Sequence, residues 1–412
     1  MPHAMTKTVT IMVYVKVGSR YEIKEVNGAS HFIEHLMFKG TKRRPTSLHI
    51  TKELDRYGAE YNAYTGKDLT VYYIKIDAAK TALAIDLLHD MLFKSKYDAE
   101  EMDRERGVII EEIHMYEDNP SSLMEDLLEE IVFPNHPLGW NIAGPKENIR
   151  KITRAQLVQY RDTHYVPART TLVVAGNVCA DVRDQLEKTF GRVSAPKGVL
   201  NHTHLPFVPP IRTAPTVTYR EKKTEQIQLG LAFLGYPYGD TRVPAARFLA
   251  MILGGSMSSR LFTEVREKRG LCYSIHASHQ SLEDTGIFSV SAGLERARLD
   301  AAVQLIWKEL RRVADEGVTR DELTRAKDHL RGKMLIHFED SASQGDWYGK
   351  QWVFQRRLQT PEERLVEMDA VKAKEIQAVA RELFVPGRLS ASLVGPFEEQ
   401  AHVERLFHRL RA

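Results

Sequence analysis

The chain has 412 residues, more than a single hydrophobic core usually supports, so two or more domains are expected. Hydrophobic residues make up 43% and charged residues 27%, which excludes a disordered or fibrous protein. The net charge of only +3 gives no reason to expect nucleic acid as a partner.

The sequence also limits the compartment. Its two cysteines, Cys179 and Cys272, cannot form a disulfide framework. It has no apolar run long enough to cross a membrane, so no membrane partner is expected. Residues 1–22 lack the pattern of a signal or transit peptide, because their apolar residues alternate as in a strand. We therefore expect a cytoplasmic protein.

The first half of the chain mixes strand and helix patterns without strict alternation. Alternating apolar residues predict strands at Val9–Val17 and Leu69–Ile76, and Tyr61–Tyr64 with Gly66 predicts a strand and turn before the latter. Helical periodicity predicts five helices: Ala29–Phe38, Ser47–Tyr57, Ala78–Phe93, Asp98–Tyr116 and Ser121–Ile131. Strands that are neighbours in sequence, with segregated helices, indicate an α+β fold rather than a doubly wound sheet.

The first of these helices carries a candidate metal site. His31 and His35 are four positions apart, so both imidazoles lie on one helix face with Glu34 beside them. The order His-x-x-Glu-His is a known zinc motif, although two ordinary histidines would be the simpler interpretation. Asn27 or Ser30 is expected to cap the helix, and Gly40 fits just past its end.

A zinc site needs a third protein ligand, and the segment Glu105–Asp118 offers candidates. Glu105 and Glu112 are two helical turns apart and share a face, whereas Glu111 lies about 100° around the helix. The neighbouring apolar residues indicate that part of this helix is buried, and a buried carboxylate needs a partner. We choose Glu112 as the ligand and Glu105 as its support or substitute.

The same helix belongs to an acidic region. Between Glu101 and Glu130 there are eleven acids and only two bases, Arg104 and Arg106. A solvated helix face explains such a run. The alternative is an acidic wall that favours basic peptides.

An internal repeat divides the chain. The segments Ile152–Gly176 and Val371–Gly395 align at a constant offset of 219 residues, with matched Val-Pro, Arg and Gly positions. Each reads as a helix, a proline turn and a strand. Duplication of a domain of about 200 residues explains this match. The second copy has Ala250, Leu253 and Gly254 at the zinc positions, so no second zinc site is expected.

A proline-rich stretch separates the copies, with Pro196, Pro206, Pro209, Pro210 and Pro215. This composition predicts an extended linker at residues 196–215. The domains are therefore placed at residues 1–195, which bind zinc, and 216–412, which do not.

Four motifs together resemble the pitrilysin-type zinc peptidases, the inverzincins: HFIEHLMFKGT, the downstream glutamate pair, NAYTGKDLTVYY and SSRLFTEVREKRGLCYS. The resemblance is strongest to the branch of the mitochondrial processing peptidase and its small bacterial relatives. It covers nearly the whole chain and implies the processing-peptidase-like metallohydrolase fold. It also implies zinc-dependent endopeptidase activity on extended, unfolded peptides, with one Zn²⁺ per chain.

The resemblance assigns roles at the metal site. The family's zinc ligands fall on His31, His35 and Glu112, its general base on Glu34, and a supporting acid on Glu105. Zinc lowers the pKa of water, and a carboxylate beside it is suited to move the proton.

The resemblance also assigns residues that bind substrate. Asn62 and Ala63 match a pair that binds the substrate backbone along an open strand edge. Phe38 matches an aromatic that lines the pocket after the scissile bond; a core phenylalanine is the alternative. Arg266 and Tyr273 match an Arg/Tyr pair that stabilises the oxyanion and holds a substrate carbonyl, whereas by themselves they would be a surface Arg and a half-buried Tyr.

In this family four such domains close a chamber, so a chain with two domains is expected to form a homodimer or a heterodimer with a paralogue. The Arg/Tyr pair would then serve the partner's zinc. A non-catalytic subunit and a small-molecule hydrolase are the rival interpretations. Relatives usually begin with an additional strand before the one at Val9–Val17, and we expect the first sheet to lack it, which puts the completeness of the N-terminus in doubt.

Overall fold

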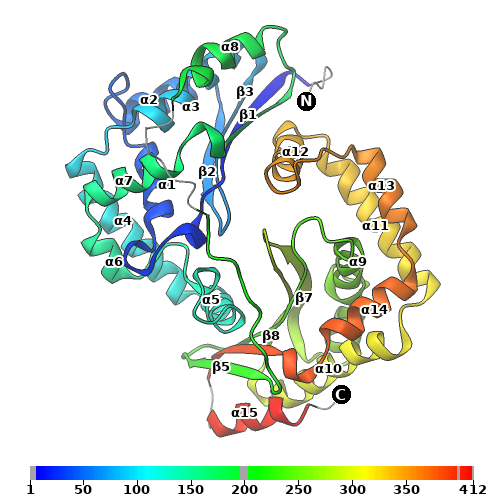
Figure 1. Ribbon diagram of the computed structural model, residues 1–412. Coiled ribbons are helices and arrows are strands. Elements are labelled where there is room, and N and C mark those ends of the chain that lie inside the picture. The colour runs from blue at the N-terminus through cyan, green and yellow to red at the C-terminus, as the bar shows by residue number, and fades with distance from the viewer. Residues whose placement is uncertain (1–5, 195–202, 397–399, 411–412) are drawn as a thin grey trace. The chain divides into compact units, whose positions relative to one another are not determined.

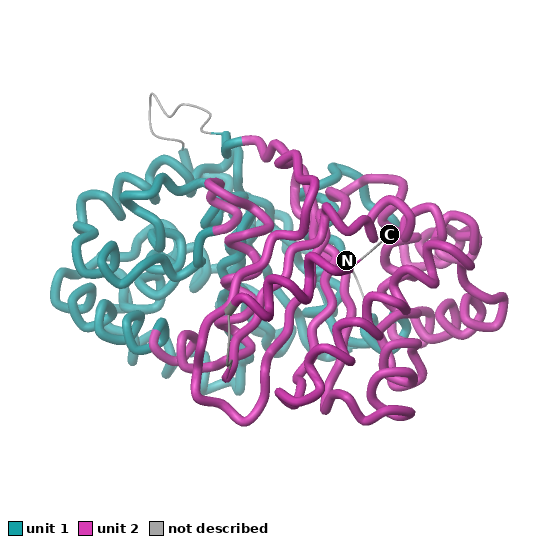
Figure 2. The backbone as a smooth tube through the Cα atoms, turned by 90° about the horizontal axis from the view of Figure 1, so that it is seen from below, with its two compact units in different colours: residues 1–113, 140–205, 334–359 teal, residues 114–139, 206–333, 360–412 magenta. Residues whose placement is uncertain are grey.

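The computed structural model describes residues 6–194, 203–396 and 400–410. The chain divides into two compact units (Figure 2). Unit 1 comprises residues 1–113, 140–205 and 334–359, and unit 2 comprises residues 114–139, 206–333 and 360–412. Each unit has its own sheet and its own apolar core.

Unit 1 is built on a four-stranded antiparallel sheet in the order β2-β3-β1-β4. The strands are β1 (Thr8–Val15), β2 (Glu60–Thr65), β3 (Thr70–Asp77) and β4 (Thr170–Gly176). One face is covered by the main helices of the unit: α1 (Ala29–Met37), α2 (Ser47–Asp55), α3 (Thr81–Lys94), α4 (Ala99–Asp118) and α7 (Arg154–His164). Two short helices complete the unit, α6 (Lys146–Lys151) and α8 (Val182–Thr189). The strands and helices predicted for the first half are confirmed.

Unit 2 is built on a five-stranded sheet in the order β5-β9-β6-β8-β7. The strands are β5 (Thr216–Glu221), β6 (Ile227–Leu234), β7 (Cys272–Ser281), β8 (Gly286–Leu294) and β9 (Ser390–Gly395). Only β5 and β9 pair in parallel. The helices of this unit are α9 (Val243–Gly254), α10 (Leu299–Glu316), α11 (Arg320–His337), α13 (Pro361–Ala370), α14 (Ala373–Leu383) and α15 (Gln400–His408).

The repeat seen in the sequence is a structural repeat. Strands β1 and β6 begin and end at positions that differ by 219 residues, and so do helices α7 and α14. The other strands correspond as β2 to β7, β3 to β8 and β4 to β9, by their order in the sheets. Strand β5 has no counterpart in the described part of unit 1. The fold is therefore a duplicated α+β domain, as expected.

The compact units differ from the sequence halves 1–195 and 216–412 by an exchange of helices. Helix α5 (Pro120–Val132) comes from the first half but packs on the sheet of unit 2, where Met124 lies against Gly230. Helix α12 (Ser341–Gln355) comes from the second half but packs on β1 and β4 of unit 1. There Asp346 accepts a hydrogen bond from Tyr14 at 3.2 Å. Each sheet thus has a second face covered by a helix from the other half of the chain.

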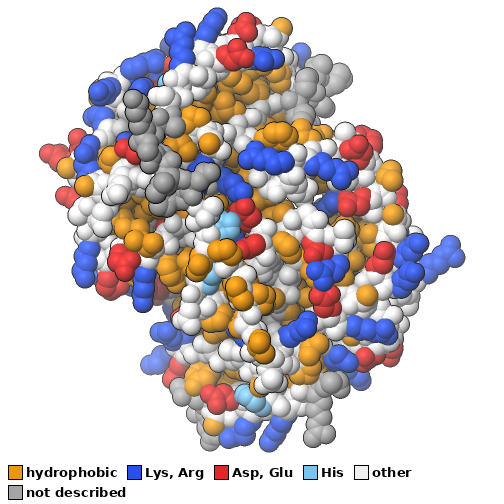
Figure 3. Space-filling view, viewed as in Figure 1, with side chains coloured by type: hydrophobic (Ala, Val, Ile, Leu, Met, Phe, Trp, Pro, Cys, Tyr) orange, Lys and Arg blue, Asp and Glu red, His pale blue; other side chains and the backbone are white. Residues whose placement is uncertain are grey.

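The helices and strands are labelled in Figure 1, and Figure 3 shows one face of the surface. On the face drawn in Figure 3, acidic and basic side chains are interspersed with hydrophobic ones. None of the described helices has both the length and the apolarity that a membrane span requires. Part of the predicted linker lies outside the described residues, and residues 203–215 contain neither helix nor strand.

Candidate metal centre

Helix α1 is held at its N-terminus by a buried carboxylate. The predicted capping by Asn27 or Ser30 is wrong, since no side-chain cap is formed and the helix begins after Gly28, which has φ +101°. Instead, Glu22 accepts the backbone N–H groups of Gly28 and Ser30 at 2.8 and 2.7 Å, and the Asn27 amide also donates to it. Burial raises the pKa of Glu22 to about 7, although these hydrogen bonds act in the opposite direction.

Three side chains converge where α1 meets α4. Oε2 of Glu112 lies 3.6 Å from Nε2 of His31 and 3.4 Å from Nε2 of His35. One ligand atom from each residue lies within 4.8 Å of the other two. The side chains are 12%, 20% and 23% exposed for His31, His35 and Glu112, so the cluster is partly buried but reachable. The tertiary structure brings together the three residues that sequence analysis chose as ligands.

The two imidazoles differ in protonation. Burial lowers the pKa of His31 to about 4, and the neighbouring His35 acts in the same direction. Burial also disfavours the charged form of His35, but hydrogen bonds with Glu105 and Glu112 outweigh it and raise its pKa to about 9. Nε2 of His31 is therefore held in a neutral imidazole, which is the form that can bind a metal cation.

Glu105 lies behind the cluster and orients His35. Its Oε2 is 3.0 Å from Nδ1 of His35, and its Oε1 is 2.5 Å from Nζ of Lys39. Only 4% of Glu105 is exposed, whereas Glu111 is exposed on the outer face of α4. A carboxylate on the far nitrogen of an imidazole fixes its tautomer and leaves Nε2 directed at the cluster. Glu105 thus contacts the candidate ligand His35, and its supporting role remains a prediction.

Glu34 points toward the strand beside the helix. Thr65, the last residue of β2, donates its hydroxyl to Oε2 of Glu34 at 2.5 Å. Burial raises the pKa of Glu34, while this hydrogen bond and His35 counteract the rise. A side chain from the sheet thus holds the Glu34 carboxylate next to the candidate metal ligands.

The predicted substrate strand is an edge strand. β2 ends the sheet of unit 1 among the described strands and pairs with β3 on one side. Asn62 is exposed and Ala63 is 9% exposed, and the Ala63 N–H donates to the Asn62 side chain at 2.9 Å. Phe38 directly follows α1, is half-buried, and packs against the core, with its ring 6.4 Å from that of Tyr72. Its pocket role remains a prediction.

Arg266 and Tyr273 lie side by side in unit 2. Arg266 belongs to a π-helical turn, Phe262–Glu267, and its guanidinium carbon lies 4.5 Å from the Phe262 ring and 5.8 Å from the Tyr273 ring. Tyr273 is 74% exposed, and a register shift interrupts the pairing of β7 with β8 between Cys272 and Ser274. π-turns and bulges often present side chains at functional sites. Their catalytic role remains a prediction.

The donor set of the cluster fits zinc. Two imidazole nitrogens and one carboxylate are the ligands of many catalytic zinc sites, which leave a fourth position for water. Tetrahedral ligands at about 2.0–2.1 Å lie about 3.3–3.4 Å from one another. The separations of 3.4 and 3.6 Å to Glu112 are close to this value.

Sequence analysis missed three residues that hold this centre: Glu22, Lys39 and Thr65. Lys39 is four positions after His35, so helical spacing would have placed its side chain next to that of His35, which Glu105 contacts. Thr65 is the last residue of the NAYT motif, but nothing in that motif indicates that its hydroxyl contacts Glu34. Glu22 reaches Gly28 and Ser30 from outside the helix, and sequence capping rules do not detect such a contact.

Family models match both halves of the chain. Residues 1–146 match the model described as Insulinase (Peptidase family M16), and residues 151–330 match the Peptidase M16 inactive domain. Two solved structures share the fold: a protease from Helicobacter pylori, with a TM-score of 0.89, 23% identity and 95% coverage of both chains, and a peptidase M16 inactive domain from Pseudomonas fluorescens, with a TM-score of 0.86, 19% identity and coverage of 97% and 96%.

Two curated relatives carry the name uncharacterized zinc protease. The one from Bacillus subtilis is 36% identical over 378 residues, which are 92% of this chain and 91% of the relative. The one from Streptomyces coelicolor is 34% identical over 400 residues, which are 96% and 86% of the two chains. With these matches along nearly its whole length, the chain belongs to the pitrilysin-type peptidases, family M16.

Proposed function

We propose that this chain is a zinc metalloendopeptidase that cleaves extended, unfolded peptides. The observation that carries the proposal is the convergence of His31, His35 and Glu112 within 4.8 Å, with Glu34 next to them on the same helix. One Zn²⁺ per chain is held by the three ligands, and Glu105 orients one of them.

In this proposal the chain's own residues move protons and bind substrate. Zinc, when bound, lowers the pKa of water and polarises the peptide carbonyl. Glu34 takes a proton from the attacking water and delivers it to the amine as the C–N bond breaks. Thr65 keeps the Glu34 carboxylate oriented during both transfers.

The substrate is proposed to add to the edge of β2 as an extra strand. Strand addition uses main-chain hydrogen bonds, so it selects extended peptides over folded ones. Asn62 and Ala63 would bind the substrate backbone, which requires the Asn62 side chain to turn away from the Ala63 N–H. Phe38 would contact the side chain that follows the scissile bond.

The proposal is tested by digesting a library of unstructured peptides with the wild type and with Glu34→Gln, and sequencing the products. General acid–base catalysis contributes about 10²–10⁴-fold, so Glu34→Gln should lower turnover by at least about 100-fold while zinc content stays unchanged. Glu111→Gln, on the exposed face of α4, is the matched control and should retain activity. Wild-type turnover by Glu34→Gln would exclude this general base.

We further propose that the active form is a dimer, in which Arg266 and Tyr273 of one chain serve the zinc of the other. A homodimer is the simplest form, and a heterodimer with a paralogue has the same geometry. Mixing Glu34→Gln with Tyr273→Phe, each inactive alone, should restore one complete site. Absence of recovery in verified mixed dimers would exclude this arrangement.

The alternative is a non-catalytic subunit, which the match of residues 151–330 to an inactive domain brings into consideration. The presence of all three candidate ligands and of Glu34 in one unit favours the peptidase. Bound zinc without cleavage of any library peptide would favour the alternative.

A further inference from the structure

Unit 2 has a cavity at one end of its sheet, where β6 and β9 meet the C-terminus of α5. Its volume is about 500 Å³, and all of its lining residues belong to unit 2. They include Leu234 at the end of β6, Val132 at the end of α5 and Ser390 at the start of β9. Pockets that bind small ligands usually measure about 300–1,000 Å³, so this cavity is large enough for one.

Part of the cavity wall is apolar. Val132 and Leu234 supply this lining together with Pro209, Pro210 and Ile211 of the segment that precedes β5. Ile211 is 99% exposed. Covering such a side chain with an apolar ligand removes it from water, which favours binding.

Two arginines line the cavity without contacting a carboxylate of the described chain. Arg212 donates from Nη1 to Oγ of Ser390 at 2.7 Å and from Nη2 to the main-chain carbonyl of Ile131, which uses two of its five N–H donors. Arg388 donates from Nη1 to the main-chain carbonyl of Glu382 at 2.8 Å. Partial burial lowers the pKa of Arg212, because no negative charge compensates it. Both cations are thus bonded only to neutral oxygens, and an anion would stabilise them.

The other charged groups of the cavity pair with each other. Oε1 of Glu382 lies 2.8 Å from Nη1 of Arg242, whose Nη2 also lies 2.7 Å from Oδ2 of Asp240. Glu382 is the one carboxylate among the lining residues, and it is therefore directed at a third arginine. The charge of Arg212 and Arg388 remains for a ligand.

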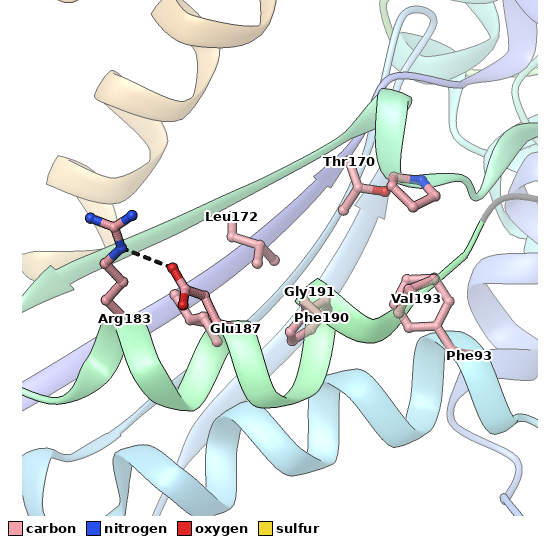
Figure 4. A pocket seen from close by; sticks show the side chains of 10 residues that line it. Phe93, Thr170, Leu172, Arg183, Glu187, Phe190, Gly191 and Val193 are labelled. Atoms are coloured by element: carbon pink, nitrogen blue, oxygen red, sulfur yellow. Dashed lines mark hydrogen bonds and ion pairs between the residues drawn. The ribbon is translucent and has the colours of Figure 1, made fainter.

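An open groove in unit 1 shows the contrasting case. It lies between β4 and α8 (Figure 4), and its two charged residues, Arg183 and Glu187, form an ion pair at 2.9 Å. That groove presents no uncompensated charge to a ligand. The cavity of unit 2 combines an apolar wall with two such charges.

The duplicated domain gives a second comparison. Arg388 matches Arg169 of unit 1 at the offset of 219 residues. The guanidinium carbon of Arg169 lies 5.4 Å from the centre of the Tyr21 ring, and its Nη1 lies 3.4 Å from Nδ1 of His164. The Tyr21 ring in turn contacts the ring of His204. Aromatic side chains therefore surround Arg169, whereas Arg388 lines an open cavity.

We propose that the cavity of unit 2 binds a small organic carboxylate with an apolar body. The carboxylate accepts hydrogen bonds from Arg212 and Arg388, since guanidinium groups match carboxylates in charge and geometry. The apolar body lies against Val132, Leu234 and Ile211. A free fatty acid and the C-terminus of an apolar peptide share this chemistry. The site is distinct from the candidate metal centre, and its test does not depend on peptidase activity.

The test is isothermal titration calorimetry of the full chain with octanoate and with N-acetyl-leucine. Saturable binding of at least one of them is expected. Octanamide, which lacks the charge, and acetate, which lacks the apolar body, should bind at least tenfold more weakly. Tighter binding of octanoate would identify a fatty acid as the source of the carboxylate, and tighter binding of N-acetyl-leucine would identify a peptide C-terminus.

Three variants place the ligand in the cavity. Arg212→Gln and Arg388→Gln should each weaken binding about tenfold or more, because each removes hydrogen bonds to a charged group. Ile211→Asp should also weaken it, by removing an apolar contact and repelling the carboxylate, and its exposed position leaves the fold unchanged. Arg320→Gln, at the exposed first residue of α11, is the matched control and should bind like the wild type.

Several outcomes would overturn the proposal. Absence of saturable binding by both carboxylates excludes the site, and equal binding of octanamide excludes a role for the charge. Unchanged binding by Arg388→Gln and Ile211→Asp places the ligand elsewhere, even if Arg212→Gln disturbs the end of α5. Displacement of octanoate by equimolar phosphate would assign the arginines to an inorganic anion instead.

Discussion

Helices α1 and α9 pack on corresponding sheets of the two units. Helix α1 carries a cluster of polar side chains, whereas the corresponding face of α9 is apolar. The candidate ligands His31 and His35 on α1 correspond on α9 to Ala250 and Gly254, and the candidate base Glu34 corresponds to Leu253. Ala250 is 5% exposed and Leu253 is fully buried. A Cβ added to Gly254 would lie 2.4 Å from the backbone nitrogen of Ala277 in β7. Unit 2 therefore has no room for an imidazole there.

The comparison shows that one backbone supports either a cluster of polar side chains or a packed apolar interface. Polar side chains on α1 need partners, because a buried charge without one is costly. Unit 1 supplies them from outside the helix: Glu105 and Glu112 from α4, and Thr65 from β2. On α9 the same face packs directly against β7, and burial of apolar side chains stabilises the unit instead. Four experiments test this difference between the units, and the one with the strongest expected consequence comes first.

The largest effect is expected from removal of a ligand. His31→Ala should lower zinc affinity by more than about 100-fold, since even the loss of a residue that supports a ligand costs about 10–100-fold. Zinc content after dialysis, measured by atomic emission, is the readout. His49→Ala, which alters a histidine of α2 bonded to Thr46, is the control and should retain zinc. Full zinc retention by His31→Ala would place the metal elsewhere and remove the contrast between the units.

A smaller effect is expected from the hydroxyl that orients Glu34. A hydrogen bond to a charged group contributes about 1.5–3 kcal/mol, so Thr65→Val should lower kcat by about 10–100-fold with little change in KM. Thr65→Ser keeps the hydroxyl and should restore most of the activity. Thr51→Val, at a half-buried threonine of α2 whose hydroxyl donates to the Leu48 carbonyl, is the control. If the Val and Ser variants were equally slow, the methyl group rather than the hydroxyl would be responsible.

The close packing of α9 is tested by adding one carbon. Gly254→Ala should destabilise the protein by about 1–3 kcal/mol, because the new Cβ meets the backbone of β7. Gly332→Ala in α11 has open space around it and should be neutral or stabilising by up to about 1 kcal/mol. Urea unfolding of both variants measures the difference. Equal stability of the two would show that α9 has room to move away from the sheet.

The smallest effect concerns acid stability in unit 2. Burial favours the neutral form of Glu322, but hydrogen bonds from Arg260 and Thr319 outweigh it and lower the pKa to about 2. Its ionised form therefore stabilises the fold above pH of about 4.5, and this contribution is lost as the pH falls toward 2. Glu322→Gln should be less stable than wild type at pH 7, and the gap should narrow at pH 3.

Glu309→Gln, on α10 beside Arg312, is a control for a general change in charge within unit 2. The candidate metal centre lies in unit 1, so both variants should bind zinc like the wild type at pH 7. A stability gap for Glu322→Gln that stays constant from pH 7 to pH 3 would contradict the lowered pKa.

Much of the fold could be predicted because it depends on local periodicity. The strand at β1 and the helix at α7 follow from alternation and helical spacing, and a duplicated sequence folds twice into the same elements. The exchange of α5 and α12 could not be predicted. Each of these helices has one apolar side. From the sequence, that side could cover either sheet, because the choice depends on the connections and on the packing partners.

The sequence by itself determined the candidate metal ligands. His31 and His35 share a face because a helix repeats every 3.6 residues, and Glu112 follows on a second amphipathic helix. Tertiary structure alone decided what holds them. Glu22 holds the N-terminus of α1 from a preceding turn, and Thr65 reaches Glu34 from a strand. The Thr65–Glu34 contact joins residues 31 positions apart, and the contacts of Glu22 with Gly28 and Ser30 reach the helix from outside it. Both depend on how elements pack against one another, which no local pattern encodes.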